Sequence, residues 1–170
     1  MSFAEPGSTK RSADLRSGGF VDRLPGVWRG DGEGHYPTIA TFGYREELTF
    51  TRLGDKPVVS YVQRTWHHDD DRPLHAECGY LRSAGPRVEL VIAQPTGFTE
   101  VHHGRDDGGA VVFGITAFAR TATAVAVHTL RRRWALDGDQ LTCDLWMTYD
   151  GVVDGHHLRS VLRPVPDRAR

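Results

Sequence analysis

Turn-forming residues interrupt the chain at regular intervals between Gly26 and Pro164. The segments between them are mostly of roughly eight to twelve residues and carry Val, Ile, Thr, Tyr, Phe and Trp at alternating positions. Such alternation is typical of half-buried strands, and Gly, Pro and Asp supply the backbone conformations that hairpins need. The pattern predicts about ten strands. The turns are Gly54-Asp55-Lys56-Pro57, Asp69-Asp70-Asp71-Arg72-Pro73, Ala84-Gly85-Pro86, Pro95-Thr96-Gly97, Arg105-Asp106-Asp107-Gly108-Gly109 and Asp137-Gly138-Asp139.

A long run of hairpins exposes two sheet edges unless the sheet closes or stacks. Because the hairpins follow one another almost without interruption, we expect an all-β fold, an antiparallel up-and-down barrel of the lipocalin or fatty-acid-binding-protein type. A β-sandwich is the second fold that fits the pattern. Helical periodicity is almost absent, and only Phe20 to Leu24 is expected to form a short helical turn.

One domain, residues 20–164, is expected to hold the whole barrel, since 170 residues suffice to bury about two thirds of the unfolded surface. Residues 1–19 are rich in Ser, Gly and charge and predict a flexible N-terminal tail. Residues 165–170 are expected to form a C-terminal tail. A homodimer is one assembly that we consider.

The charges nearly balance, with 21 basic and 22 acidic residues. This balance favours neither nucleic acid nor an anionic membrane as a partner. Cys78 and Cys143 do not form a disulfide framework, and no segment resembles a signal peptide or a membrane span. We therefore expect a cytoplasmic protein. Nucleophile elbows, HExxH helices, phosphate loops and CxxC pairs do not occur, so ordinary hydrolase or kinase chemistry has no support.

The first predicted strand has glycines at alternate positions around one large aromatic residue, in Gly26-Val27-Trp28-Arg29-Gly30-Asp31-Gly32. A strand face without side chains permits a sharp bend or the close approach of another backbone. The indole of Trp28 is large enough to plug one end of a small barrel. Pro37 then interrupts the strand ladder, and Thr38 is expected at a rim where a ligand can meet it.

Alternation is clearest in the segment Gln140 to Tyr149. Leu141, Cys143, Leu145, Met147 and Tyr149 share one face of this strand. We interpret Cys143 as a buried thiol, and both cysteines as structural, because neither lies at an electropositive helix terminus.

Nine histidines include the adjacent pairs His67-His68, His102-His103 and His156-His157. Neighbouring residues on a strand point to opposite faces, so such a pair does not chelate one metal. We interpret the first two pairs as solvated strand ends beside acidic turns. The third pair begins the last strand at a barrel mouth, where a flat cofactor could enter. Alternation slightly favours His156 on the inner face, but the residues alone leave the choice between His156 and His157 open.

Five motifs together resemble the nitrobindin family, from about Leu24 to Arg163. They are Gly26-x-Trp28-x-Gly30-x-Gly32, Tyr36-Pro37-Thr38-Ile39, Leu74-His75-Ala76-Glu77 with Gly79-Tyr80, Pro95-Thr96-Gly97, and Met147 followed ten residues later by His157-Leu158. The resemblance implies a ten-stranded barrel with heme b, one per subunit, at an open end. It implies His157 as the axial ligand of the iron, with a bulge near Gly155 accounting for its orientation.

The resemblance also implies the other heme contacts. Thr38 would touch the heme, and His75 would lie near the porphyrin or its propionates. Val127 and Met147 would supply apolar wall, and Phe42 is a weaker candidate. The implied ligands are nitric oxide and peroxynitrite, which the family isomerises to nitrate on ferric heme. Which of the two is the physiological ligand stays open.

The alternative function is that of a heme-free carrier for a fatty acid or another apolar molecule. Such carriers usually fix a carboxylate with an inward Arg. Arg131, Arg132 and Arg133 lie on one strand, so at least one could point inward, although we expect them mostly to face solvent.

Overall fold

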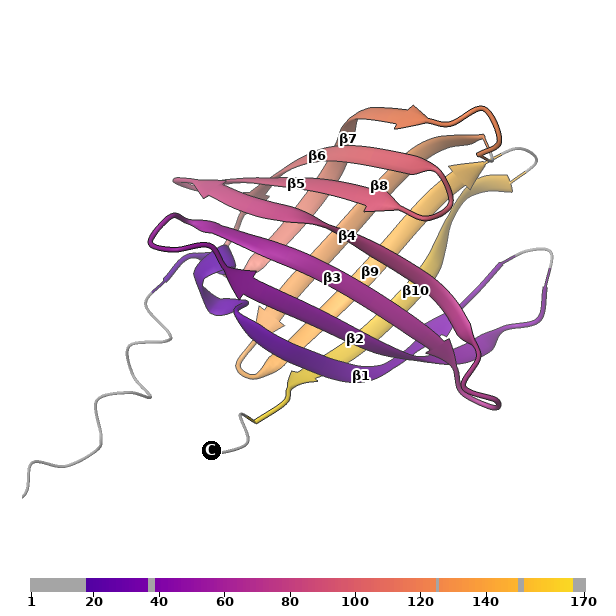
Figure 1. Ribbon diagram of the computed structural model, residues 1–170, viewed down its shortest axis with the longest axis horizontal. Coiled ribbons are helices and arrows are strands. Elements are labelled where there is room, and N and C mark those ends of the chain that lie inside the picture. Colours follow the sequence, from indigo (N-terminus) through magenta and orange to yellow (C-terminus); the bar gives the residue numbers. More distant parts are fainter. Residues whose placement is uncertain (1–17, 37–38, 125, 150–151, 167–170) are drawn as a thin grey trace, which may run out of the picture.

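The structure, a computed structural model, describes residues 18–36, 39–124, 126–149 and 152–166. They form a closed barrel of ten antiparallel strands in which successive strands pair and β1 pairs with β10 (Figure 1). The expected up-and-down barrel is confirmed, and the sandwich is wrong. The elements are η1 (Phe20–Arg23), β1 (Gly26–Gly34), β2 (Phe42–Arg52), β3 (Val58–His67), β4 (Pro73–Ala84), β5 (Arg87–Gln94), β6 (Phe98–Asp106), β7 (Ala110–Arg120), β8 (Val127–Asp137), β9 (Gln140–Tyr149) and β10 (Val152–Pro164).

Each of the six predicted turns lies at a hairpin connection between these strands. Gly54 and Gly138 have φ of 62° and 58°, a region that glycine adopts without steric cost. The expected N-terminal tail falls almost entirely outside the described residues. None of the helices in the described ranges has the length and apolar character needed to cross a bilayer.

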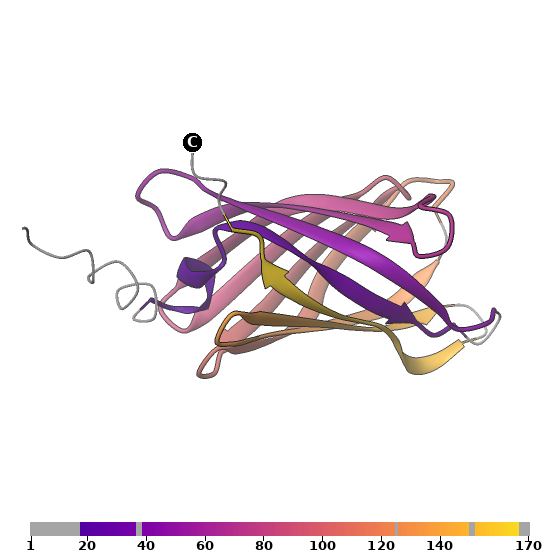
Figure 2. The same cartoon turned by 90° about the horizontal axis from the view of Figure 1, so that it is seen from below.

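The short helix η1 closes one end of the barrel. Figures 1 and 2 both place it at the end of the barrel where β2 leads into β3. Phe20 and Leu24 are buried there beside Trp28, whose indole Nε1 donates to the carbonyl of Leu24 at 2.8 Å. Trp28 therefore fills the end of the barrel, as the first motif predicted.

The glycines of β1 allow β10 and β2 to approach closely. A Cβ at Gly30 would overlap the carbonyl oxygen of Val161 on β10, and a Cβ at Gly32 would overlap the ring of Tyr44 on β2. The strand face without side chains thus lets backbone and aromatic groups pack where the barrel closes.

Strands β7 and β8 separate before they end. Their pairing covers only Ala110 to Gly114 on β7 and Arg131 to Ala135 on β8. Residues 117–120 of β7 pair with β6 alone and are exposed. At the end opposite η1, β7 and β8 therefore diverge and are no longer hydrogen-bonded to each other.

Candidate functional site

A cavity of about 450 Å³ lies inside the barrel at the end opposite η1. Its lining residues come from β2, β3, β4, β5, β6, β8, β9 and β10 and from the loops that hold Tyr36 and Thr96. The volume falls within the range of small-molecule and cofactor sites. Much of the wall is apolar and includes Tyr36, Phe42, Leu74, Leu130, Leu145 and Leu158.

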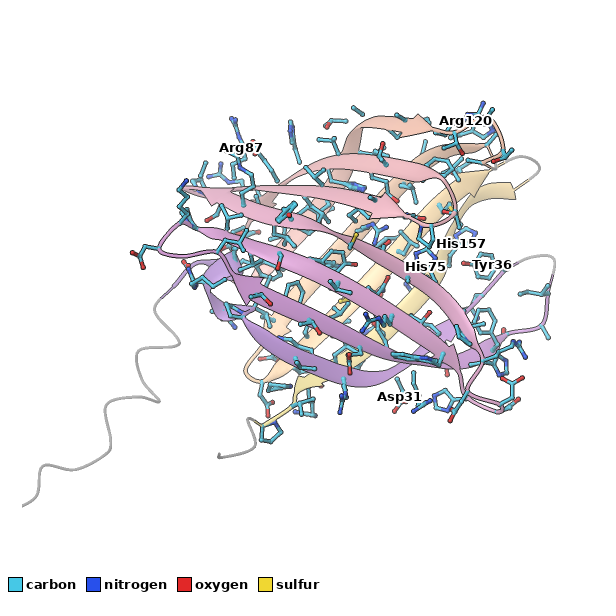
Figure 3. All side chains as sticks on the ribbon, viewed as in Figure 1. Asp31, Tyr36, His75, Arg87, Arg120 and His157 are labelled. Carbon is cyan, nitrogen blue, oxygen red and sulfur yellow. The ribbon has the colours of Figure 1, made fainter. Side chains whose placement is uncertain are left out.

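The structure brings most of the predicted site residues to this cavity. His75, Val127, Met147 and Phe42 all line it. Figure 3 shows His75, Tyr36 and His157 at the same end of the barrel. Thr38 lies outside the described residues.

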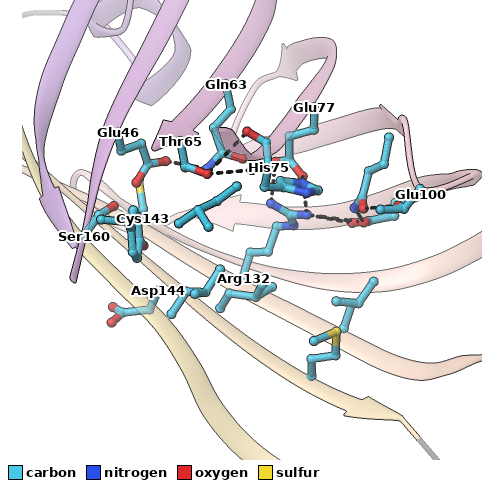
Figure 4. A pocket seen from close by; sticks show the side chains of 18 of the residues that line it. Glu46, Gln63, Thr65, His75, Glu77, Glu100, Arg132, Cys143, Asp144 and Ser160 are labelled. Atoms are coloured by element: carbon cyan, nitrogen blue, oxygen red, sulfur yellow. Dashed lines mark hydrogen bonds and ion pairs between the residues drawn. The ribbon is translucent and has the colours of Figure 1, made fainter. Parts of the chain in front are cut away.

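A buried ion network forms the polar side of the cavity (Figure 4). Arg132 on β8 binds Glu77 on β4 through Nη1–Oε1 at 2.7 Å and Nη2–Oε2 at 2.9 Å. Its Nη2 also donates to Glu100 Oε2 on β6 at 3.1 Å. Tyr61 donates to the same Glu77 carboxylate. One guanidinium therefore holds two carboxylates across the barrel.

Each end of this network terminates in an imidazole. His75 Nε2 lies 3.4 Å from Glu77 Oε2 and has access to the cavity. His102 Nε2 lies 2.6 Å from Glu100 Oε2, and the His102 side chain is 0 % exposed. The interpretation of His102 as a solvated strand end is therefore wrong. Phe98, Glu100 and His102 occupy every second position of β6, so all three point inward.

The electrostatics of the network favour ionised Glu77. Burial alone would raise the pKa of Glu77, but the charge of Arg132 and hydrogen bonds from His75 and Arg132 outweigh it and lower that pKa. Burial lowers the pKa of Arg132, whereas the charges of Glu77 and Glu100 raise it. The carboxylates outweigh burial, so the pKa of Arg132 is raised. The pair is thus charged inside the barrel.

A second polar group adjoins the network on β2 and β3, where Gln63 pairs across the strands with Glu77. Gln63 donates to Glu46, and both line the cavity. Burial raises the pKa of Glu46, although the hydrogen bond from Gln63 lowers it. Cys143 also lines the cavity and is partly buried against the core, on the inner face of β9 where alternation placed it. Burial raises the pKa of its thiol, which favours the unreactive protonated form.

His157 is fully buried beside the cavity wall. Its side chain is 0 % exposed, and its ring meets that of Tyr36 edge-on at a centroid distance of 5.2 Å. His157 is not itself among the described lining residues, whereas its neighbours Met147 and Leu158 are. The imidazole therefore stands directly behind the cavity wall.

The hydrogen bond of His157 identifies the nitrogen that carries its proton. Nδ1 lies 2.6 Å from the carbonyl oxygen of Gly155, and a carbonyl only accepts, so Nδ1 donates. The Met147 N–H also approaches this Nδ1, at 3.3 Å, and is the longer of the two contacts. The lone pair of the ring then lies on Nε2. Histidine ligands of metals commonly have this arrangement, with the second ring nitrogen bonded to a backbone carbonyl.

The neighbouring His156 takes the outer face. Its Nε2 lies 2.9 Å from Asp144 Oδ1, and its side chain is 34 % exposed. Strand alternation slightly favoured His156 as the inner residue, and the structure reverses this. The reason is a register shift in the pairing of β10 with β9 between His156 and Leu158.

The ion network was missed in the sequence although a signal existed. Arg131 is exposed and Arg133 partly so, as expected, but Arg132 is 6 % exposed. Leu130 and Trp134 flank Arg132 at alternate positions and are buried, which places Arg132 on the inner face. The same alternation applies to Glu77 and Glu100.

The inward Arg132 does not favour the carrier alternative. Its guanidinium already binds the carboxylates of Glu77 and Glu100. A fatty-acid carboxylate would have to displace one of these partners and would add a further negative charge to a group that already has two carboxylates for one cation. The polar side of the cavity is therefore poorly suited to an anionic lipid head.

Comparison with known proteins agrees with this geometry. The model of the THAP4-like, heme-binding β-barrel domain matches residues 19–163. A protein of Rhodococcus jostii (strain RHA1) named peroxynitrite isomerase 1 is 45% identical over 139 residues, which cover 81% of this chain and 78% of the relative. The peroxynitrite isomerase of Nocardia farcinica (strain IFM 10152) is 43% identical, over 82% of this chain and 86% of its own.

Solved structures show the same fold. The crystal structure of Rv2717c from M. tuberculosis superposes with a TM-score of 0.76 and 38% identity, covering 84% of this chain and 93% of the other. The S-type phycobiliprotein lyase CPES from Guillardia theta has a TM-score of 0.60 at 10% identity, a likeness of fold alone. With its ten-stranded barrel, its cavity and a family match that spans nearly all of the barrel, the chain belongs to the THAP4-like, heme-binding β-barrel family, as the resemblance to nitrobindin implied.

Proposed function

We propose that the protein binds one heme b per subunit in the barrel cavity, with His157 as the axial ligand, and that it isomerises peroxynitrite to nitrate. Nitric oxide is a second proposed ligand. The observation that carries the proposal is the buried His157, whose Nδ1 donates to Gly155 and whose lone pair is on Nε2, beside an apolar cavity in a heme-binding fold. The relatives named peroxynitrite isomerase support the reaction.

The residues present fit a heme. A porphyrin is flat and apolar, and Phe42, Val127 and Met147 offer apolar surface around the cavity. A neutral imidazole that donates through Nδ1 is a suitable axial ligand for heme iron. When bound, ferric heme supplies a Lewis-acid centre at which peroxynitrite can rearrange.

The chain's own contribution is to bind, orient and exclude water. The hydrogen bond from Nδ1 to Gly155 fixes the rotation of the His157 ring. The apolar walls limit access of water to the bound ligand. The proposed role of His75 is to present its imidazole to the cavity from a fixed position, since Glu77, which Arg132 holds in place, lies 3.4 Å from its Nε2.

Two free cysteines, one of them exposed, suit a reducing compartment. We propose the cytoplasm as the location on that ground.

The test is a titration of the purified protein with hemin, followed by absorption spectroscopy. The His157→Ala and His156→Ala variants are treated identically. We expect a saturable Soret band in the wild type and in His156→Ala and its loss or a marked shift in His157→Ala. Absence of a band in the wild type would reject the heme proposal and redirect the search to lipid extraction and mass spectrometry.

The reaction itself is tested by stopped-flow decay of peroxynitrite with the ferric protein. We expect faster decay with nitrate as the product at the expense of nitrite, and no acceleration by the protein without hemin. A loaded wild type that leaves rate and product ratio unchanged would reject the isomerase activity while leaving heme binding intact. Nitric oxide binding is read in the same samples from the shift of the Soret band.

A further inference from the structure

The strand β10 contains a bulge at His157. His156 pairs with Trp146, and Leu158 pairs with Leu145, the adjacent residue of β9, so His157 is the extra residue between them. A bulge changes the face to which side chains are directed. Leu158 consequently lines the cavity and His157 is fully buried directly behind its wall, although the two are neighbours in the chain.

On the outer face of the barrel, two side chains hold His156, the residue before the bulge. His156 Nε2 bonds Asp144 Oδ1 at 2.9 Å, and the His156 ring packs on that of Trp146 at a centroid distance of 4.9 Å. We call His156, Asp144 and Trp146 the bulge clamp. Figure 4 shows the Asp144 carboxylate directed away from Arg132 and the other polar groups of the cavity.

Further cations fix the clamp from both neighbouring strands. Arg133 of β8 and Arg159 of β10 lie 3.6 Å and 3.5 Å from the carboxylate of Asp144. The guanidinium of Arg131 lies 3.9 Å from the centre of the Trp146 ring, a cation–π contact. Although it belongs to the outer face, the Asp144 side chain is only 5 % exposed. The clamp is thus a compact group spanning β8, β9 and β10.

Two arrangements of β10 are conceivable, one with His156 on the inner side and one with His157 there, and the outer contacts of the clamp favour the second. Regular alternation would place His156 inside, on the face of Leu158, and the bulge places His157 there instead. Either residue would place an imidazole beside the cavity wall. The contacts of the outer residue therefore decide, and only the observed arrangement gives His156 both Asp144 and Trp146.

We propose that the bulge clamp is a positioning device that keeps His156 outside and fixes His157 in the orientation needed by an axial ligand. This inference depends on the proposed role of His157. Partners that orient a metal-bound histidine typically change metal affinity by about 10- to 100-fold when removed. The clamp acts through the backbone of the bulge: Asp144 forms part of the cavity wall, but its carboxylate is directed away from the polar groups of the cavity.

The test compares hemin-loaded Asp144→Ala, Asp144→Asn and His156→Ala with the wild type. The readouts are the iron–histidine stretching band of the ferrous protein in resonance Raman and the rate of hemin transfer to apomyoglobin. Asp139→Ala is the matched control, because Asp139 also forms an outer ion pair with β10, to Arg163 at 2.6 Å, away from the bulge. His157→Ala is measured in parallel.

We expect a shifted or broadened band and about tenfold faster hemin loss in Asp144→Ala and His156→Ala. Asp144→Asn retains an acceptor for His156 and should recover most of the wild-type band, and Asp139→Ala should match the wild type. If both Ala variants keep the wild-type iron–histidine band and the wild-type rate of hemin transfer, the clamp proposal is overturned, even where a variant is less stable than the wild type. A wild-type band in His157→Ala would instead overturn the axial ligand, which separates the two failures. Should Asp144→Ala not fold, the half-exposed His156→Ala decides alone.

Discussion

Arg132 donates two parallel hydrogen bonds to Glu77 inside the barrel, from Nη1 to Oε1 at 2.7 Å and from Nη2 to Oε2 at 2.9 Å. Both side chains are almost fully buried, at 7 % and 1 % exposure. Two-point pairing of this kind fixes the plane of the carboxylate as well as its position. It ties β8 to β4 across the cavity and holds the carboxylate against which His75 lies.

Removal of the cation should destabilise the fold strongly. Arg132→Met leaves Glu77 and Glu100 as buried carboxylates without their guanidinium, a loss of about 3–5 kcal/mol in the free energy of unfolding. The triple variant Arg132→Met/Glu77→Gln/Glu100→Gln removes the charges together and should regain most of that loss. Urea unfolding measures both, and a loss of less than about 1 kcal/mol in the single variant would show that the network is not structurally important.

Glu46 predicts a dependence of stability on pH. In the unfolded chain its carboxyl ionises near the ordinary pKa of 4.5, whereas burial raises its pKa in the folded protein. Between these two values the unfolded state releases a proton that the folded state retains. Glu46 therefore makes the fold less stable as pH rises through that range.

Glu46→Gln should consequently stabilise the protein near pH 7 and make little difference below about pH 4, where Glu46 is protonated in both states. The gain is about 1.4 kcal/mol for each unit by which the folded pKa exceeds the unfolded one. Glu33→Gln is the control, since Glu33 is 73 % exposed. Equal stability of Glu46→Gln and wild type across the range would show that Glu46 ionises normally.

The sequence was most informative where strand alternation and turn chemistry are regular. The six turn motifs located six hairpins, and alternation in β9 placed Leu141, Cys143, Leu145 and Met147 on the inner face. The close approach at Gly30 was likewise visible, because a glycine repeat on one strand face has few other uses. These features depend on local backbone geometry.

Features that depend on distant partners were harder to predict. The bulge at His157 reverses alternation, and nothing in residues 152–158 by themselves reveals that Asp144 and Trp146 on another strand hold His156 outside. The network around Arg132 joins β4, β6 and β8, so its partners become evident only with the strand order. The segment 121–126 carried no turn signal, and there β7 and β8 separate.

Because the guanidinium of Arg132 already binds Glu77 and Glu100, the wild type should not bind fatty acids. Glu77→Gln/Glu100→Gln removes both carboxylates from Arg132 and should create a measurable affinity for a carboxylate such as laurate, because the buried cation then lacks a counter-ion. Adding Arg132→Met to this variant should abolish that affinity again. Isothermal titration calorimetry follows all three proteins, and micromolar binding of laurate by the wild type would revive the carrier function.

The two ends of the barrel should separate stability from cofactor binding. Trp28 packs with η1 at the end opposite the cavity, and its Nε1 donates to Leu24 at 2.8 Å. Trp28→Ala should lower the free energy of unfolding by about 3–5 kcal/mol and change hemin affinity by less than about a factor of two, since distant sites act independently. Leu130→Ala is the matched comparison, because Leu130 is also buried but lines the cavity. It should lower both stability and hemin affinity. Urea unfolding without hemin and hemin titration of the folded variants measure the two quantities, and equal losses of hemin affinity in both variants would show that the barrel responds as one unit rather than at two separate ends.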